Sequence, residues 1–319
     1  MANGLDTATF GRTGLEVTRL GYGAMEMSGT LHGRTVTEDE ARNILNAVLD
    51  AGISFIDTSI DYGRSEELIG KYISHRRSEF YLATKCGCPV GVPPDKVQGG
   101  LSNHAYTREN IVTGVNQSLA RMKTDHLDVV QFHGPPPAEA IDEAIQTLRD
   151  LKSEGKVRFM GVSQLSEVHG VSAHLSDLQH LPDDIARGVY DVFQIPYSAL
   201  LRQNENLITT AAEAKSGTII RGGVAQGEPG QGRGSDEVWQ KFHEAKLDDL
   251  REEGENRSVF MLRFTLTHPS LHTTIVGTKN PEHLQDNVRA AQRGALSQHT
   301  YQEAKRRLDG VGLSPAKGS

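Results

Sequence analysis

The chain has 319 residues, of which 37% are hydrophobic, and a formal net charge of −7 at pH 7. This length suits one large α/β barrel or two smaller domains, and the acidic balance argues against a nucleic-acid-binding protein, whose surface is usually basic. No run approaches the ~20 consecutive apolar residues that a transmembrane helix needs, so we expect no membrane-spanning segment.

The first half of the chain alternates between strand-like and helix-like patterns. Two short runs around a Gly-Arg-Thr-Gly turn predict an N-terminal β-hairpin over about residues 8–18. Apolar residues at helical spacing predict helices at 37–51, 65–74, 107–122 and 138–154. Short β-branched and aromatic runs predict strands at 17–23, 54–57, 80–85 and 127–132.

The alternation continues in the second half. We expect strands at 157–163, 192–195, 218–221 and 273–277, and helices at about 204–215, 256–267 and 280–291. Eight strands alternating with helices predict a parallel (β/α)8 TIM barrel rather than an open sheet. We expect a single domain over residues 1–319, with a Gly-rich, mobile active-site loop at about 222–236 and a helical C-terminal extension at about 292–319.

Four chemically different side chains lie at or just beyond the ends of consecutive predicted strands: Asp57, Tyr62, Lys85 and His133. The carboxyl ends of barrel strands converge on one face, where active sites lie. A phenol has a reference pKa of about 10, which a neighbouring ammonium lowers, while a carboxylate orients that ammonium. An imidazole can hydrogen-bond a substrate oxygen. Taken singly, each residue has an ordinary explanation, such as an Asx turn or a surface position. Together they predict a proton-transfer site.

These residues stand in a series of motifs that resembles the aldo-keto reductase family over nearly the whole chain. The series comprises GRTGLEVTRLGYGAM, FIDTSIDYGRSEELIGKYI, LATK, LDVVQFHGP, GKVRFMGVSQLS, FQIPYSAL and IVGTKNPEHLQDN. The resemblance implies a (β/α)8 barrel that binds a nicotinamide cofactor without a Rossmann fold, and no G-x-G-x-x-G follows a predicted strand. It also implies that Asp57, Tyr62, Lys85 and His133 form a catalytic tetrad, with Tyr62 as the proton donor.

Cofactor contacts are implied by the same resemblance. Ser163, Gln164 and Gln194 would hold the nicotinamide carboxamide, with Gln164 standing where the family usually has Asn. Tyr197 would stack on the nicotinamide ring, with ordinary packing in the barrel as the alternative. The remaining expected contacts are Gly23, Ala24, Met25, Asp57, Gly277, Thr278, Lys279, His283, Asp286 and Asn287. Lys279, at a predicted helix N-terminus, would neutralise a 2′-phosphate, which favours NADPH. NADH stays open, because a solvated helix-end charge looks the same in sequence.

One segment departs from the family's pattern. After the seventh strand many relatives carry an aromatic residue followed by Ser-Pro-Leu, whereas this chain has Arg221, Gly222, Gly223 and Val224. The glycines permit close backbone approach to the cofactor. Arg221 either binds a phosphate oxygen or pairs with a carboxylate at the barrel rim.

The two cysteines, Cys86 and Cys88, are too close in sequence for a favourable disulfide and match no zinc motif. We expect them to pack beneath the site in a reduced, cytoplasmic protein. The histidines show no ligand spacing such as H-E-x-x-H, so no metal site is expected. Asp61, the remaining carboxylate of SFIDTSIDY, receives no role.

The sequence therefore predicts an NADPH-dependent oxidoreductase that interconverts small-molecule carbonyls and alcohols. A cofactor-sensing regulatory subunit with little turnover is the first alternative, because such a barrel would keep the same tetrad. A phosphate-handling aldolase or isomerase, with Lys85 forming a Schiff base, is the second. Neither the substrate nor the oligomeric state follows from the sequence.

Overall fold

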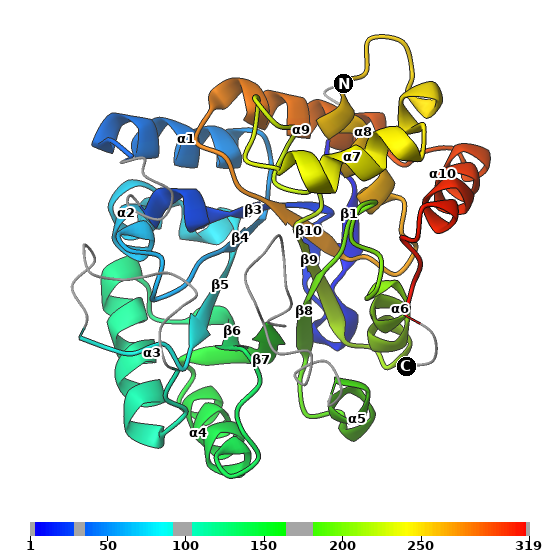
Figure 1. Ribbon diagram of the computed structural model, residues 1–319. Helices are drawn as coiled ribbons and strands as arrows, with labels where there is room; N and C mark the ends of the chain where they lie inside the picture. The colour runs from blue at the N-terminus through cyan, green and yellow to red at the C-terminus, as the bar shows by residue number, and fades with distance from the viewer. Residues whose placement is uncertain (1–3, 29–35, 92–103, 164–180, 317–319) are drawn as a thin grey trace.

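The computed structural model describes residues 4–28, 36–91, 104–163 and 181–316, and its centre is a closed barrel of parallel strands (Figure 1). Each barrel strand pairs with the next along the chain, and β10 pairs with both β9 and β3 to close the ring. The strands are β3 (Leu20–Gly23), β4 (Phe55–Asp57), β5 (Tyr81–Cys86), β6 (Leu127–His133), β7 (Val157–Ser163), β8 (Val192–Pro196), β9 (Gly217–Arg221) and β10 (Thr273–Val276). The predicted (β/α)8 fold is confirmed.

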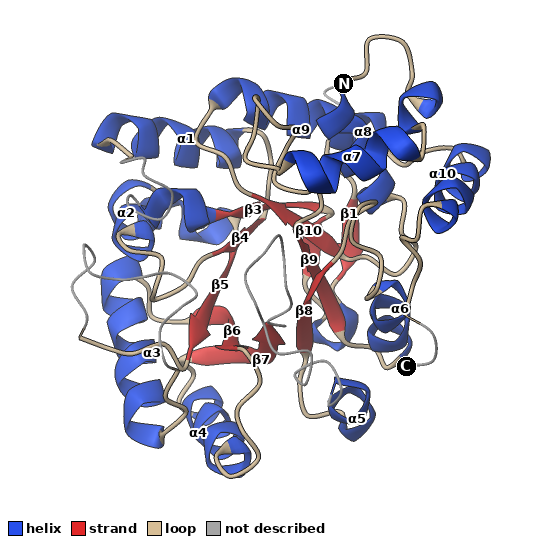
Figure 2. Cartoon of the chain, in the orientation of Figure 1, coloured by secondary structure: helices blue, strands red, loops and turns tan. Residues whose placement is uncertain are grey.

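Helices surround the barrel on its outer face (Figure 2). They are α1 (Glu38–Asp50), α2 (Ser65–Tyr72), α3 (Arg108–Met122), α4 (Ile141–Ser153), α5 (Leu181–Arg187), α6 (Glu205–Glu213), α7 (Asp236–Glu244), α8 (Arg257–Leu266), α9 (Pro281–Arg293) and α10 (Gln298–Gly310). Short 3-10 turns add η1 (Gly11–Thr13), η2 (Ala24–Ser28), η3 (Ser74–Glu79) and η6 (Leu247–Leu250).

The predicted helices agree with α1–α4, α6, α8 and α9, apart from small shifts at their ends. The predicted C-terminal extension contains α10. Two short helices, α5 and α7, were not predicted. In α7 the buried residues are Trp239 and Phe242, which are too few to produce a recognisable helical repeat.

A short antiparallel hairpin closes the amino-terminal end of the barrel, as predicted. Its strands, β1 (Thr7–Thr9) and β2 (Glu16–Thr18), flank a turn in which Gly11 has a φ of 54°. A Cβ on Gly11 would lie 2.4 Å from the backbone nitrogen of Gly217, so glycine is required there. Phe10 is buried against Phe55, with ring centroids 5.5 Å apart. The interior cluster around it consists of Phe10, Leu15, Val17, Phe55, Ala83, Val129, Val192 and Ile219.

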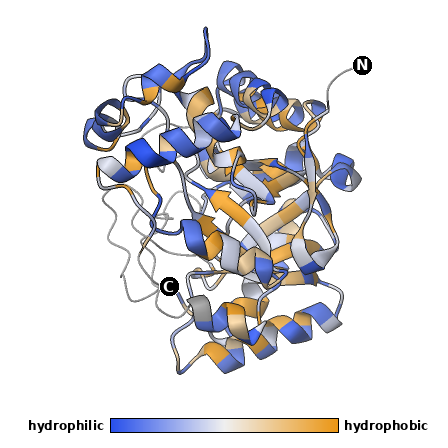
Figure 3. Cartoon of the chain, turned by 90° about the vertical axis from the view of Figure 1, so that its right-hand side faces the viewer, coloured by the Kyte–Doolittle hydropathy of each residue, from blue (hydrophilic) through white to orange (hydrophobic). Residues whose placement is uncertain are grey.

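A larger core lies between the barrel and the surrounding helices. Hydrophilic and hydrophobic residues alternate along the helices, while the strands are largely hydrophobic (Figure 3). In α1, the buried residues include Ile44, Leu45 and Val48, and Thr37 caps the helix by accepting a hydrogen bond from Glu40 N at 3.2 Å. Within the described ranges, no helix is long and apolar enough to cross a membrane.

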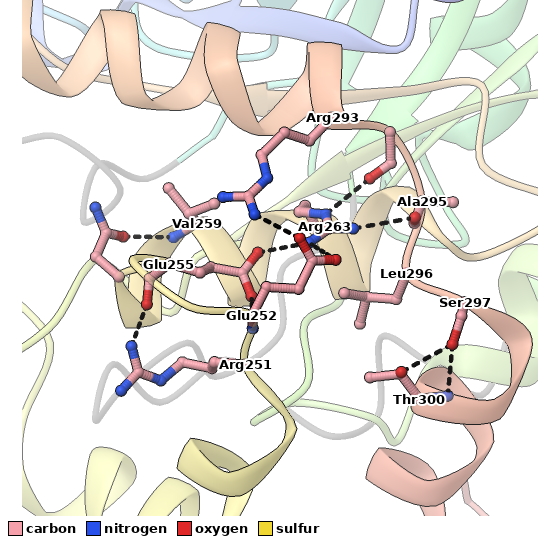
Figure 4. Close-up of polar contacts among 12 residues, drawn as sticks. Arg251, Glu252, Glu255, Val259, Arg263, Arg293, Ala295, Leu296, Ser297 and Thr300 are labelled. Carbon is pink, nitrogen blue, oxygen red and sulfur yellow. Dashed lines mark hydrogen bonds and ion pairs between the residues drawn. The ribbon is translucent and has the colours of Figure 1, made fainter.

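A buried arginine joins the segments that support α9 (Figure 4). Arg263 of α8 donates from Nη1 to Glu252 Oε1 at 2.8 Å and to Glu255 Oε1 at 2.7 Å, and from Nε to the carbonyl of Gly294 at 3.0 Å. Glu252 also pairs with Arg293, the last residue of α9. This network fixes the carboxyl end of α9 against α8, so the amino end of α9, which follows β10, has a defined position at the barrel mouth.

Candidate active site

Strand alternation places a layer of polar side chains directly above the interior apolar cluster. Residues two apart in a strand point to the same side of the sheet. The inward pairs are Phe55 and Asp57, Ala83 and Lys85, Val129 and Gln131, Val192 and Gln194, and Ile219 and Arg221. The polar member of each pair lies nearer the carboxyl end of its strand, so the layer occupies the end of the barrel where the sequence predicts the site.

Asp57 connects the members of this polar layer. Its Oδ2 accepts a hydrogen bond from Lys85 Nζ at 2.6 Å, and its Oδ1 accepts from Gln131 Nε2 at 2.8 Å and Gln194 Nε2 at 3.0 Å. The Lys85 and Asp57 side chains are 1% and 2% exposed. Burial alone would lower the pKa of Lys85, but the charge and hydrogen bond of Asp57, together with the charges of Tyr62 and Asp61, outweigh it and hold that pKa above its usual value. Lys85 is therefore a fixed ammonium group.

Tyr62 lies between Lys85 and His133. Lys85 Nζ is 5.0 Å from the centroid of the phenol ring, and the His133 ring meets it edge-on with centroids 6.2 Å apart. Burial raises the pKa of Tyr62 to about 12, although Lys85 acts in the opposite direction. The expected lowering by the ammonium is present, but desolvation outweighs it. The phenol is therefore protonated at neutral pH, as a proton donor must be.

His133 ends β6 and meets a carboxylate and a thiol. Its Nδ1 lies 3.4 Å from Asp61 Oδ2 and 3.2 Å from Cys88 Sγ. Burial alone would raise the pKa of the Asp61 carboxyl, but His133 and the hydrogen bond from Ser59 hold it well below its usual value. Burial raises the pKa of the Cys88 thiol far above its usual value. The carboxylate and the thiol beside Nδ1 fix the orientation of the imidazole ring.

The expected carboxamide ligands Ser163 and Gln194 occupy paired positions on β7 and β8. Ser163 Oγ donates to Gln194 Oε1 at 3.1 Å, and the Gln194 amide in turn donates to Asp57, so both are joined to the tetrad. Gln164 lies outside the described residues. The structure thus brings together Ser163 and Gln194, and their role as carboxamide ligands stays a prediction.

Tyr197 has a different environment from the one that stacking requires. Its ring is fully buried, with ring centroids 6.2 Å from Phe264 and 5.3 Å from His268, and its Oη lies 3.1 Å from Tyr301 Oη. Side chains from α8 and α10 therefore cover the ring. Packing is the role that these contacts support, and stacking on a cofactor stays a prediction.

Arg221, at the end of β9, lies near the tetrad, and the glycines that follow it lie against the protein interior. The charge of Arg221 acts on Tyr62 and Asp57, while burial lowers the pKa of its guanidinium group. This favours the alternative in which Arg221 faces a carboxylate. A Cβ on Gly223 would lie 2.9 Å from Thr274 Oγ1, so packing against β10 already requires glycine there. Contacts of Gly222, Gly223 and Val224 with a cofactor stay predictions.

The Gly-rich segment after Val224 has a hydrogen-bonded conformation. Arg233 N donates to Gln226 O at 2.8 Å, and Trp239 Nε1 donates to Ala225 O at 3.2 Å. Arg233 also forms an ion pair with Glu26 of η2. The loop therefore reaches the segment that follows β3, and its mobility stays a prediction.

The predicted phosphate segment leads from β10 into the first turn of α9. Tyr22 Oη donates to the carbonyl of Thr278 at 2.7 Å, and Thr278 Oγ1 accepts from Asn280 N at 3.0 Å. Asn280 caps α9 by accepting from Glu282 N at 2.9 Å. These bonds fix an amino-terminal helix end at the barrel mouth, which is a favourable place for an anion.

The other predicted phosphate and adenine contacts flank this helix end. Lys279 is half-buried, His283 is exposed, and Asp286 forms an ion pair with Arg289 on the same helix. The backbones of Gly23 and Gly277 approach closely, since a Cβ on Gly277 would lie 2.7 Å from Gly23 O. Three further predicted positions lie in these two segments: buried Ala24, half-buried Met25 and half-buried Asn287.

Sequence reasoning missed four side chains of the site. Gln131 stands two residues before His133 on β6, so strand alternation alone indicates its inward position. Asp61 directly precedes Tyr62, but no sequence pattern marks a loop carboxylate as buried. Cys88 is buried, in agreement with the expected packing, but its contact with His133 was not predicted. His104, four residues before α3, has its ring centroid 5.1 Å from that of His133.

Comparisons with known proteins agree with the fold and with the resemblance in sequence. The sequence model of the Aldo/keto reductase family matches residues 19–308. The chain is 31% identical over 301 residues to "Aldo-keto reductase YhdN" of Bacillus subtilis, covering 86% of this chain and 85% of the relative. It is 27% identical over 311 residues to "Putative voltage-gated potassium channel subunit beta" of Schizosaccharomyces pombe, covering 88% and 87%. Its structure is similar to the aldo-keto reductase AKR11C1 of Bacillus halodurans (holo form), with a TM-score of 0.78, 25% identity and coverage of 95% and 96%.

Proposed function

Since this chain belongs to the aldo/keto reductase family, a family of oxidoreductases that act on carbonyl compounds, we propose that it is an NADPH-dependent enzyme. It reduces aldehydes or ketones to alcohols in a reaction that also runs in the oxidative direction. The observation that carries the proposal is a protonated phenol, Tyr62, held beside the buried Asp57–Lys85 pair and the His133 ring.

The donor set at the barrel mouth fits a nicotinamide group. The hydroxyl of Ser163 and the amide of Gln194 are hydrogen-bonded to each other. Each could instead form a hydrogen bond with the carboxamide of a nicotinamide, which offers one acceptor oxygen and two N–H donors. Among the described residues, Gln131 Oε1 is buried without a hydrogen-bond partner, so the layer has an unused acceptor. Lys279 and the first turn of α9 would bind the phosphates. The bound nicotinamide would supply the hydride.

Each residue of the tetrad then has a separate role in proton transfer. Tyr62 donates its proton to the carbonyl oxygen as negative charge develops there. Lys85 stabilises the phenolate that is left, and Asp57 keeps Lys85 charged and in position. His133 hydrogen-bonds the substrate oxygen and fixes its approach. A Schiff-base mechanism would require a neutral Lys85, which the ion pair with Asp57 opposes.

The decisive experiment compares two tyrosine variants for NADPH oxidation with a panel of aldehydes and ketones. Tyr62→Phe removes the proposed acid, and we expect kcat/KM to fall about 10²–10⁴-fold. Tyr72→Phe is the matched control, because that phenol contacts Glu38 on the outer helices, and we expect its activity to be unchanged. Full activity of Tyr62→Phe would show that the acid is another group.

A second candidate function follows from the similarity to the potassium channel β subunit of fission yeast. In that case the chain would be a regulatory subunit that binds NADPH with little turnover. Tight NADPH binding, together with negligible oxidation on every carbonyl of the panel and a stable protein partner, would favour this function over the enzyme.

A further inference from the structure

Four potential metal ligands, one of which is His133, meet in a single cluster. They come from four separate segments: Asp61 from the loop after β4, Cys88 from the turn after β5, His104 from the approach to α3, and His133 from the end of β6. One ligand atom from each lies within 4.8 Å of the other three. We call these residues the Asp-Cys-His-His cluster. The strands β4, β5 and β6, next to which the cluster lies, are neighbours in the barrel (Figure 1).

The spacing of the ligand atoms suits a small tetrahedral ion. Bonds of about 2.0–2.3 Å from a tetrahedral zinc ion place its ligand atoms roughly 3.2–3.7 Å apart. Here His133 Nδ1 is 3.2 Å from Cys88 Sγ and 3.4 Å from Asp61 Oδ2. The widest separation in the cluster is at most 4.8 Å, so binding requires only a small inward movement of the side chains.

Hydrogen bonding within the protein does not account for all of the cluster. Asp61 accepts from Ser59 and faces His133, so its carboxylate has partners. In contrast, His104 Nε2 is buried and has no hydrogen-bond partner in the part of the chain that the structure describes. A buried polar atom left without a partner is destabilising, which is a reason to look for a ligand that is not part of the chain.

We propose that Asp61, Cys88, His104 and His133 bind one zinc-like transition-metal ion. A thiolate and two imidazoles select zinc and similar metals over Mg²⁺ and Ca²⁺, which prefer oxygen ligands alone. Four protein ligands make a closed site rather than one with an open position for catalysis. Binding replaces the proton on Cys88 and is therefore accompanied by proton release to solvent. The sequence did not predict this site, because its ligands follow no local spacing motif.

The proposed ion goes beyond carbonyl reduction and does not depend on it. His133 Nδ1 faces Asp61 and Cys88, so a metal bound on this side leaves Nε2 as the nitrogen that carries a proton. The ion would therefore set the tautomer of a residue that the proposed reaction uses. The two proposals are separable, because metal binding can be measured by spectroscopy without any substrate.

The test uses the full chain, freed of metal with a chelator and titrated with Co²⁺ and with Zn²⁺. We expect one equivalent to bind, with visible d–d bands of tetrahedral cobalt and a thiolate-to-cobalt charge-transfer band in the near ultraviolet. Cys88→Ser should abolish the charge-transfer band. His104→Gln and Asp61→Asn should each weaken Zn²⁺ binding at least about tenfold, since even the loss of an outer hydrogen-bond partner costs that much at metal sites.

Two matched controls keep the test specific. Cys86→Ala removes a buried cysteine two residues from Cys88 but outside the cluster, and His299→Ala removes an exposed histidine of α10. Both should bind cobalt as the native chain does. Circular dichroism of every variant separates lost binding from lost folding. The proposal is overturned if the native chain binds no stoichiometric cobalt, or if folded Cys88→Ser retains the charge-transfer band.

Discussion

Replacing Asp57 by asparagine should damage both the stability and the activity of this protein. Asp57 accepts three hydrogen bonds, one from Lys85 and two from glutamine amides. An asparagine of the same shape has one acceptor oxygen and one NH2 group. Whichever way its amide is turned, the NH2 group faces either the ammonium of Lys85 or the amide donors. At least one buried donor therefore loses its acceptor.

The size of the effect follows from the burial of the pair. Both side chains are at most 2% exposed, so water cannot replace the lost carboxylate. Removing one partner of such a buried pair costs about 3–5 kcal/mol, which corresponds to a fall in Tm of roughly 4–7 °C for a chain of this size. We also expect kcat to fall at least about 10²-fold, because Lys85 no longer has a fixed position beside Tyr62.

Asp128 provides a matched control at the opposite end of the barrel. It is 1% exposed and accepts hydrogen bonds from Arg77 at 2.6 Å, from Arg158 at 2.5 Å and from the backbone of Leu82 at 2.8 Å. Its arginine partners are 18% and 43% exposed and can be solvated again, so Asp128→Asn should cost less, about 2 kcal/mol. It should leave kcat unchanged.

The assay combines thermal unfolding with steady-state kinetics on the active carbonyl of the panel, for both variants. An Asp57→Asn protein that melts within about 2 °C of the native chain would refute the energetic reasoning, since a loss of 3 kcal/mol or more corresponds to at least about 4 °C. An equal loss of kcat in Asp128→Asn would refute the catalytic reasoning, because it would reflect general damage to the barrel.

Three further outcomes are expected. Lys279→Ala should raise KM for NADPH about tenfold or more, because it removes a charged contact worth ~1.5–3 kcal/mol. KM for NADH should not change. An equal rise for both cofactors would show that Lys279 does not bind the 2′-phosphate. Gly70→Ala should lower the free energy of unfolding, measured by chemical denaturation, by at least about 1–3 kcal/mol, because the new Cβ would lie 1.9 Å from Arg121 O. Gly310→Ala is the control: its Cβ would have nothing within 4 Å, so the change should be neutral or slightly stabilising. Burial lowers the pKa of His272 to about 4, so the unfolded chain binds more protons between about pH 4 and 6.5 and stability falls as pH falls through that range. His272→Asn should reduce the stability difference between pH 7.5 and pH 5 by about 1–2 kcal/mol, and an unchanged difference would place the titrating group elsewhere.

Local sequence patterns predict the barrel and the meeting of Asp57 with Lys85 well. The strand ending at Asp57 and the strand containing Lys85 follow from β-branched and aromatic runs between helical repeats, and parallel strands bring their ends together. The contact between the Asp57 and Lys85 side chains at 2.6 Å follows from this topology. The same logic extends to Gln131, which alternation places inside the barrel.

Other features depend on interactions that no local pattern encodes. The meeting of Asp61, Cys88 and His104 depends on three loops whose paths the apolar repeat does not determine. The protonation of Tyr62 depends on the balance between burial and the charge of Lys85, and only the packed structure gives the size of each. Tyr197 is buried because α8 and α10 cover it, which a motif on β8 cannot indicate.

The hairpin at the amino-terminal end of the barrel affects which parts of the sequence can be substituted without loss of folding. Phe10 and the apolar layer beneath the site fill the floor of the barrel, while the polar layer that carries the chemistry stands above it. The floor tolerates few substitutions, because each side chain there fits against several others. Among the residues that the structure describes, none of this apolar cluster comes from a loop on the opposite face. New substrate preferences can therefore arise by exchange of those loops, and a laboratory library confined to them should retain folded members at high frequency.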